Sequence, residues 1–143
     1  MEEITFEISG VPIGKVRHRS TVMPNGMIHN YNTKKNTNYE RLVKREYKKQ
    51  YPNTYFIGEL VVSITAYYPI PKSWSKKKKQ EAIDGIARPI VKPDVDNVSK
   101  IILDSLNGVA FDDDKQVIEL HIHKVYGENP RVYVSILGDS VTV

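Results

Sequence analysis

Two aspartates separated by one residue, Asp94 and Asp96, are the side chains in this sequence best placed to do chemistry. Pro93 precedes them, fixes its own φ and favours an extended conformation at Lys92. If the chain stays extended, Asp94 and Asp96 point to one side of it, with Cα atoms about 6.5 Å apart. Two carboxylates this close repel each other unless a cation lies between them. The pair therefore predicts a site for a divalent metal ion.

Further charged residues follow at spacings that suit a metal-dependent reaction on a phosphate. The run Asp112-Asp113-Asp114 comes just before a predicted strand, and any of the three can supply a third carboxylate. Mg²⁺ prefers oxygen ligands in octahedral geometry and keeps several waters, so carboxylates, phosphate oxygens and water complete its shell. Lys100 lies four residues after Asp96, one helical turn further, where an ammonium can offset charge on a phosphate or a leaving oxygen. These residues together suit a Mg²⁺ site beside a bound phosphate.

Each of these features also has a purely structural interpretation. Asp96 can be the N-cap of the helix that follows it. Three consecutive aspartates are typical of a solvated turn, and Lys100 with Asp104 is a common i,i+4 ion pair on a helix surface. The occurrence of all these features together, about one helix apart, is what favours the functional interpretation.

The same residues resemble the motifs of the RusA family of Holliday-junction resolvases, which are endodeoxyribonucleases of bacteria and their phages. The family pattern of Asp-x-Asp-Asn, Lys, Asp-x-Leu-Asn and Asp-Asp-x-Gln-Val is similar to this sequence in order and spacing. It is found here as Asp94-Val95-Asp96-Asn97, Lys100, Asp104-Ser105-Leu106-Asn107 and Asp113-Asp114-Lys115-Gln116-Val117. Residues 12–19 also resemble the basic segment of many members, although His18 stands where members commonly have Pro.

The resemblance implies an activity and a set of site residues. It implies a crossover junction endodeoxyribonuclease that resolves four-way DNA junctions by paired symmetric cuts, with Mg²⁺ as the cofactor and Mn²⁺ as a substitute. Asp94, Asp96 and Asp114 would bind the metal, with Asp113 as a substitute for Asp114, and Lys100 would be the catalytic cation. It also implies a homodimer, because two symmetric cuts need two active sites. The residues themselves leave open a nuclease for other branched or flapped DNA, and a non-catalytic junction-binding protein.

Positive and negative charge are separated along the sequence. Residues 1–93 carry 17 Lys and Arg against 8 Asp and Glu, whereas residues 94–143 carry 4 against 9. A basic surface beside a cluster of carboxylates suits a metal-dependent enzyme that acts on a polyanion. The candidates for contacts with DNA are Lys15, Arg17 and Arg19, the helical residues Lys44, Lys48 and Lys49, and the run Lys76, Lys77, Lys78 and Lys79. Such lysine runs are also typical of helix faces that only make a protein soluble.

The elements that must position these residues follow from hydrophobic periodicity and turn residues. We expect strands at 4–8, 58–70, 115–126 and 131–137, a short hairpin at 20–31, and helices at 34–50, 75–84 and 97–107. Thr33 and Ser75 are predicted N-caps. The run Gly127-Glu128-Asn129-Pro130 predicts a turn that joins the last two strands as an antiparallel hairpin. The pattern predicts an α+β fold, a single domain over residues 1–143 with a mixed β-sheet flanked by about three helices.

Composition excludes several other classes of protein. The sequence has no cysteine, which rules out disulfide frameworks, Cys-ligated metal sites and thiol catalysis. It has no apolar run near the roughly 20 residues of a membrane helix and no leader-like start, so we expect a cytoplasmic protein, bacterial or phage-encoded, without membrane contact. His121 and His123 alternate on a predicted strand, where we expect them to face solvent.

Overall fold

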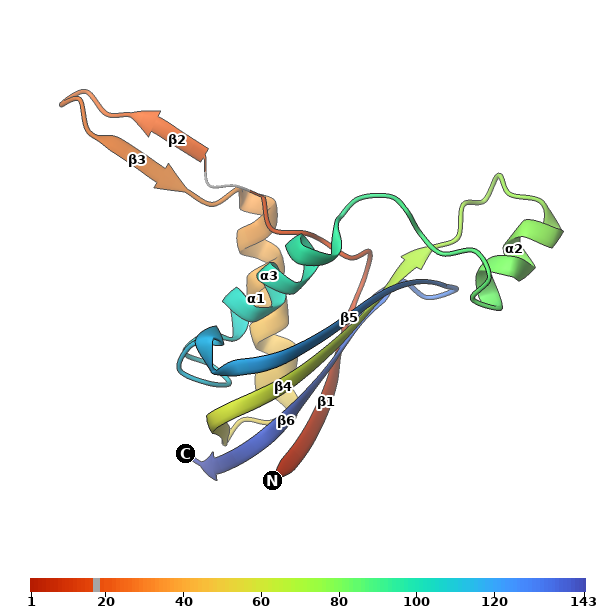
Figure 1. Cartoon of the computed structure of the whole chain (residues 1–143). Coiled ribbons are helices and arrows are strands. Elements are labelled where there is room, and N and C mark those ends of the chain that lie inside the picture. Colours follow the sequence, from red (N-terminus) through yellow and green to blue (C-terminus); the bar gives the residue numbers. More distant parts are fainter. Residues whose placement is uncertain (17–18) are drawn as a thin grey trace.

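The computed structural model describes residues 1–16 and 19–143. A four-stranded sheet in the order β1-β6-β4-β5 forms its centre. The strands are β1 (Glu2–Ser9), β4 (Thr54–Pro69), β5 (Val117–Gly127) and β6 (Arg131–Thr142). β6 runs antiparallel to β1 and to β4, whereas β5 runs parallel to β4. With the helices α1 (Lys34–Gln50), α2 (Lys76–Ile83) and α3 (Val95–Leu106), this arrangement confirms the predicted α+β fold with a mixed sheet (Figure 1).

The hydrophobic core lies between the sheet and the pair α1 and α3. Alternate residues of β4 from Leu60 to Tyr68 are buried, together with the apolar residues of β1 and β6 that share their face. α1 contributes Tyr39, Val43 and Tyr47 to the same cluster. The residues between them on β4 are only half-buried, so the opposite face of the sheet is open. Because buried and half-buried side chains alternate along the strand, one face of the sheet packs against the helices.

The last two strands do not form the predicted hairpin. β4 lies between β5 and β6 and pairs with both of them. β4 is 16 residues long and rich in β-branched and aromatic residues, so both of its edges favour pairing. The turn after Gly127 crosses the end of β4, where a Cβ on Gly127 would lie 2.9 Å from Cδ1 of Tyr67. The turn itself is present where it was predicted, but it connects strands that are not neighbours.

Helix caps explain where the first two helices begin. The Thr33 side chain accepts a hydrogen bond from the backbone N–H of Asn36, and the Ser75 side chain accepts one from Lys78. Both predicted N-caps are therefore confirmed, and α1 has the predicted bounds. A short hairpin of β2 (Arg19–Val22) and β3 (Ile28–Tyr31) precedes α1, as predicted. It projects from the rest of the molecule (Figure 1).

The start of α3 differs from the sequence prediction. Asp94 has an extended backbone conformation (φ −72°, ψ 158°) and is itself the N-cap, so α3 begins at Val95 rather than near Asn97. Asp96 is consequently in the first turn of a helix, and the expectation that residues 94–96 form an extended segment is wrong. The predicted strand at 115 is also shorter, because Asp113 caps the 3₁₀ helix η1 (Asp114–Gln116) and β5 begins after it.

Two further expectations concern membranes and histidines. None of the helices that the structure describes is long and apolar enough to cross a membrane. His121 and His123 are exposed on β5, as predicted.

Candidate active site

α3 carries a row of charged residues along the side opposite its buried stripe. Asp96, Lys100 and Asp104 follow one another at intervals of four residues, so they lie on one side of the helix. The buried side contains Val98, Ile101, Ile102 and Leu106. Because the apolar residues fix the rotation of α3 against the sheet, they also fix the direction in which the charged row faces.

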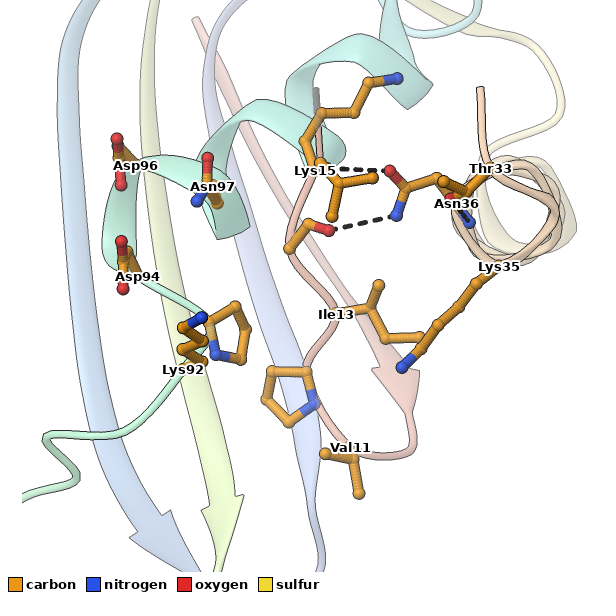
Figure 2. A pocket seen from close by; sticks show the side chains of 14 residues that line it. Val11, Ile13, Lys15, Thr33, Lys35, Asn36, Lys92, Asp94, Asp96 and Asn97 are labelled. Atoms are coloured by element: carbon orange, nitrogen blue, oxygen red, sulfur yellow. Dashed lines mark hydrogen bonds between the residues drawn. The ribbon is translucent and has the colours of Figure 1, made fainter. Parts of the chain in front are cut away.

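Asp94 and Asp96 are the two carboxylates at the start of this row. Asp94 occupies the N-cap position, but its side chain makes no capping hydrogen bond. Both residues are exposed, and neither forms an ion pair within residues 1–16 and 19–143. They lie close together at the first turn of α3 in Figure 2 and line a cleft of about 1140 Å³, together with Lys92 and Asn97. Two carboxylates in one turn therefore remain available for a ligand.

The backbone that carries Asp94 is held by its neighbours. The Tyr68 hydroxyl donates a hydrogen bond of 2.5 Å to the carbonyl of Pro93. On the other side the backbone N–H of Lys15 donates to the carbonyl of Asn97 at 2.8 Å. Gly14 packs so closely that an added Cβ would lie 2.6 Å from Cβ of Pro93. The segment after β1 thus lies directly against the start of α3.

Asn36 fixes that segment on α1, and sequence analysis did not single it out. Its side chain is 2% exposed. Its Oδ1 accepts a hydrogen bond of 3.0 Å from the N–H of Val16, and its Nδ2 donates one of 3.1 Å to the carbonyl of Gly14 (Figure 2). A single asparagine inside a helix gives no signal in the sequence that it will bind a distant backbone segment.

Lys15 belongs to a network of ion pairs beneath the charged row. It is 7% exposed, and its Nζ lies 2.7 Å from Oε1 of Glu40 and 3.7 Å from Oδ2 of Asp104. Lys100 is exposed, with its Nζ 3.4 Å from the same oxygen of Asp104. Asp104 therefore joins a buried and an exposed ammonium. The ammonium of Lys15 is already paired with carboxylates of the protein itself. A contact between Lys15 and DNA stays a prediction.

The three aspartates before β5 have different surroundings. Asp112 accepts a hydrogen bond from the Tyr55 hydroxyl, and Asp113 accepts one from the backbone N–H of Lys115 at 2.9 Å. This backbone bond lowers the pKa of Asp113. Burial raises the pKa of Asp114, with contributions from Asp113 and Asp104. Asp112 and Asp113 are therefore engaged in local hydrogen bonds, whereas the charges of Asp104 and Lys100 on α3 act on the pKa of Asp114.

The carboxylates of the predicted site are spread out in the structure rather than gathered into one cluster. Among the described residues, no three Asp, Glu or His side chains are grouped closely enough to hold a metal ion. Asp96 and Asp104 are about 12 Å apart along the helix axis, with Lys100 between them. The Asp94 and Asp96 oxygens are hard donors without partners in the described chain, which fits Mg²⁺ as an ion that takes one or two carboxylates and keeps several waters.

The predicted DNA contacts are spread over several elements. Lys76 and Lys77 are exposed at the start of α2, and Lys48 and Lys49 are exposed at the end of α1. Lys44 is half-buried. Lys78 lies over the Trp74 ring, 4.1 Å from its centroid. Arg17 lies outside the described residues, and Arg19 begins β2.

Comparisons with known proteins agree with the motifs. The sequence profile described as Endodeoxyribonuclease RusA matches residues 9–137. The chain is also 38% identical over 138 residues to Uncharacterized protein YqaN of Bacillus subtilis (strain 168), which covers 95% of this chain and 96% of that protein. The profile match includes the charged row of α3, the aspartates before β5 and most of the sheet. The chain belongs to the RusA endodeoxyribonuclease family.

Proposed function

We propose that this protein is a Mg²⁺-dependent crossover junction endodeoxyribonuclease, which resolves four-way DNA junctions by paired symmetric phosphodiester cuts in the bacterial cytoplasm. Family membership supports the endodeoxyribonuclease activity. The observation that carries the proposal is the pair Asp94 and Asp96, two exposed carboxylates in one turn with Lys100 one turn further.

Asp94 and Asp96 are the proposed metal ligands, with Asp114 as the third carboxylate and Asp113 as its substitute. Mn²⁺ is a suitable replacement, because it also favours carboxylate and water oxygens. When bound, Mg²⁺ polarises the scissile phosphate and lowers the pKa of an attacking water. The charges of Lys100 and Asp104 act on the pKa of Asp114, which supports a place for Asp114 near this side of α3.

Lys100 is the proposed catalytic cation. Its ammonium is exposed and bound only to Asp104 among the described residues, so it can turn to a phosphate or a leaving 3′-oxygen. Asp104 keeps Lys15 as a partner when Lys100 leaves it. The buried Lys15 and Glu40 thus allow Lys100 to move without leaving Asp104 unpaired.

The proposed substrate is branched DNA bound by a homodimer. A four-way junction has nearly two-fold symmetry, and a dimer with two-fold symmetry places one active site on each of two equivalent strands. Lys76 and Lys77, together with Arg17 and Arg19, are the proposed phosphate contacts. Contacts of this kind predict binding that weakens steeply as salt rises.

The test is cleavage of a synthetic four-way junction beside linear and flapped duplexes of the same sequence. Each substrate is incubated with Mg²⁺, Mn²⁺ or EDTA and with wild type, Asp94→Asn or Asp139→Asn. Asp139 is an exposed carboxylate paired with the N-terminal amine, far along the chain from the charged row, so its variant is the matched control. We expect paired symmetric nicks in the junction alone, lost in EDTA and reduced at least about 100-fold by Asp94→Asn, with binding retained.

The other outcomes identify the alternatives. Preferential cutting of the flapped duplex would show a nuclease for other branched DNA. Tight junction binding without any cut across Mg²⁺ and Mn²⁺ titrations would show a non-catalytic junction-binding protein. Equal nicking by wild type and Asp94→Asn would remove Asp94 from the site.

A further inference from the structure

Residues 72–92 form an arm between the end of β4 and the candidate active site. The arm contains α2 and the loop that leads to Asp94, and Figure 1 shows it projecting beyond the end of the sheet. Its sequence carries seven Lys and Arg against one Glu and one Asp. The arm is therefore strongly basic and leads directly to Asp94.

The arm also exposes large apolar side chains. Ile86 is 73% exposed, Ile90 95% and Val91 54%, and Ile83 on α2 is 50% exposed. Ala82 is 1% exposed and Pro89 is buried, so the arm has an inward side. The exposed isoleucines and Val91 are not on that side. Isoleucine and valine are among the residue types most often buried. Four of them exposed within one arm of 21 residues make the arm a candidate binding surface.

The two ends of the arm are held against the sheet, and its second end lies directly beside the candidate active site. Lys124 on β5 donates a hydrogen bond to the carbonyl of Val91, and Tyr68 on β4 donates one to the carbonyl of Pro93. The Trp74 ring packs edge-on against Tyr126, with centroids 5.1 Å apart. Asp94 is four positions after Ile90, so their Cα atoms are at most about 14 Å apart.

Charge decides which partner suits this surface. A second copy of the arm packed against it would bring two strongly basic segments together, which is unfavourable. DNA satisfies both features at once, because lysines bind phosphates and apolar side chains insert between base steps. Isoleucine is one of the side chains that DNA-binding proteins use as such a wedge.

We propose that Ile90, assisted by Ile86, is a wedge that inserts between base pairs at the branch point of a DNA junction, while the lysines of α2 hold the flanking phosphates. The inference rests on the proposed function and adds how a branched substrate is selected. Inserting a wedge costs least where base stacking is already interrupted, so the arm favours a branch point over a linear duplex.

The experiment uses a four-way junction with 2-aminopurine beside the branch point, bound in EDTA so that no strand is cut. The fluorescence of this base rises when it is unstacked. The proteins are wild type, Ile90→Ala, the double variant Ile86→Ala/Ile90→Ala, and Ile118→Ala as the matched control. Ile118 is 60% exposed on β5, outside the arm. A linear duplex with the same label serves as the reference substrate.

We expect wild type and Ile118→Ala to raise the fluorescence of the junction but not of the duplex. Ile90→Ala should lose most of this rise at saturation, and the double variant all of it, with an unchanged dependence of binding on salt. Because the replaced side chains are exposed, the melting temperature should not change.

Three results separate failure of the wedge from failure of the proposed function. A wild-type protein that does not bind the junction overturns the proposed function at its binding step, and the wedge with it. A full fluorescence rise with the double variant overturns the wedge alone. Conversion of a wild-type dimer to a monomer by Ile90→Ala, measured by sedimentation, also overturns the wedge and assigns the surface to contacts between copies.

Discussion

The hydroxyl of Tyr68 donates its hydrogen bond to the carbonyl of Pro93, the residue immediately before Asp94. Tyr68 is 2% exposed at the end of β4, so the central strand directly holds the backbone of the candidate site. Tyr68→Phe keeps the ring and removes this bond. We expect the free energy of unfolding to fall by about 1 kcal/mol, measured by urea denaturation. Junction cleavage should fall about 10-fold or more, because Asp94 loses part of its fixed position.

Tyr67→Phe is the control for that prediction. Tyr67 is the preceding residue of the same strand, and its ring lies under the Arg131 guanidinium, 3.8 Å from the ring centroid. Phenylalanine keeps this contact, so cleavage should stay at the wild-type rate. Equal losses in both variants would mean that the hydroxyl of Tyr68 does not position the site.

Substitutions of the neighbouring residues Asp113 and Asp114 are expected to have opposite effects on stability and on cleavage. Asp113 caps η1 and forms a capping box with Gln116, so Asp113→Ala should cost about 1 kcal/mol of stability and leave cleavage measurable. Asp114→Ala removes a proposed metal ligand and should abolish cleavage with little change in stability. Thermal unfolding and junction cleavage of both variants check this. The reverse pattern would assign the metal to Asp113.

A substitution of Glu40 tests the contribution of its buried ion pair with Lys15. Glu40→Gln leaves a buried ammonium with only Asp104 as a charged partner, and we expect the free energy of unfolding to fall by about 3 kcal/mol. Glu46→Gln on the same helix is the control. Glu46 lies 3.9 Å from the exposed Arg45, and such a pair contributes less than about 1 kcal/mol. Similar losses in the two variants would contradict the special role of the Lys15 pair.

A substitution of Gly14 tests the close contact between the segment after β1 and the start of α3. In Gly14→Ala the added Cβ meets Pro93 at 2.6 Å and Asn97 at 3.0 Å, so one segment must move. We expect a loss of about 1–3 kcal/mol of stability, and a weaker stabilisation of the fold by Mg²⁺ in thermal unfolding. Val16→Ala, which shortens a half-exposed side chain two residues further on, should do neither.

The raised pKa of Tyr47 predicts how stability depends on pH in the alkaline range. Burial, with smaller contributions from Glu2 and Tyr51, raises the pKa of Tyr47 from 10.0 to about 12. The unfolded chain loses this proton near pH 10 whereas the folded chain keeps it, so stability is complete below pH 10 and declines between pH 10 and 12. Tyr47→Phe should make urea unfolding less dependent on pH in this range, by at most about 1.4 kcal/mol per pH unit. An unchanged slope would contradict the prediction.

Features that depend on nearby residues could be predicted from the sequence. Thr33 and the spacing of Tyr39, Val43 and Tyr47 are sufficient to give the bounds of α1, because capping and helical periodicity act within a few residues. The neighbouring positions of Asp96 and Lys100 were predictable for the same reason. The exact start of α3 was not, because Asp94 and Asp96 are both acceptable N-cap residues.

Features that depend on pairing between distant segments could not be predicted. The turn at residues 127–130 favours a hairpin locally, yet the insertion of β4 between β5 and β6 depends on both edges of β4. That parallel pairing of β5 also decides where Asp114 lies relative to α3. The contacts of Lys15 with Glu40 and of Asn36 with Gly14 join residues more than 20 positions apart, and nothing in the sequence near any of them indicates the partner.

The row Asp96, Lys100 and Asp104 shares one helix with the buried stripe of α3, which restricts how this protein can change. Inserting a single residue between Asp96 and Asp104 would turn the rest of the helix by about 100°. The later charges would then rotate towards the core, while Ile102 and Leu106 would rotate towards solvent. Insertions and deletions inside α3 should therefore be strongly destabilising. The candidate chemistry and the hydrophobic core depend on the same helical register, and neither can shift without the other.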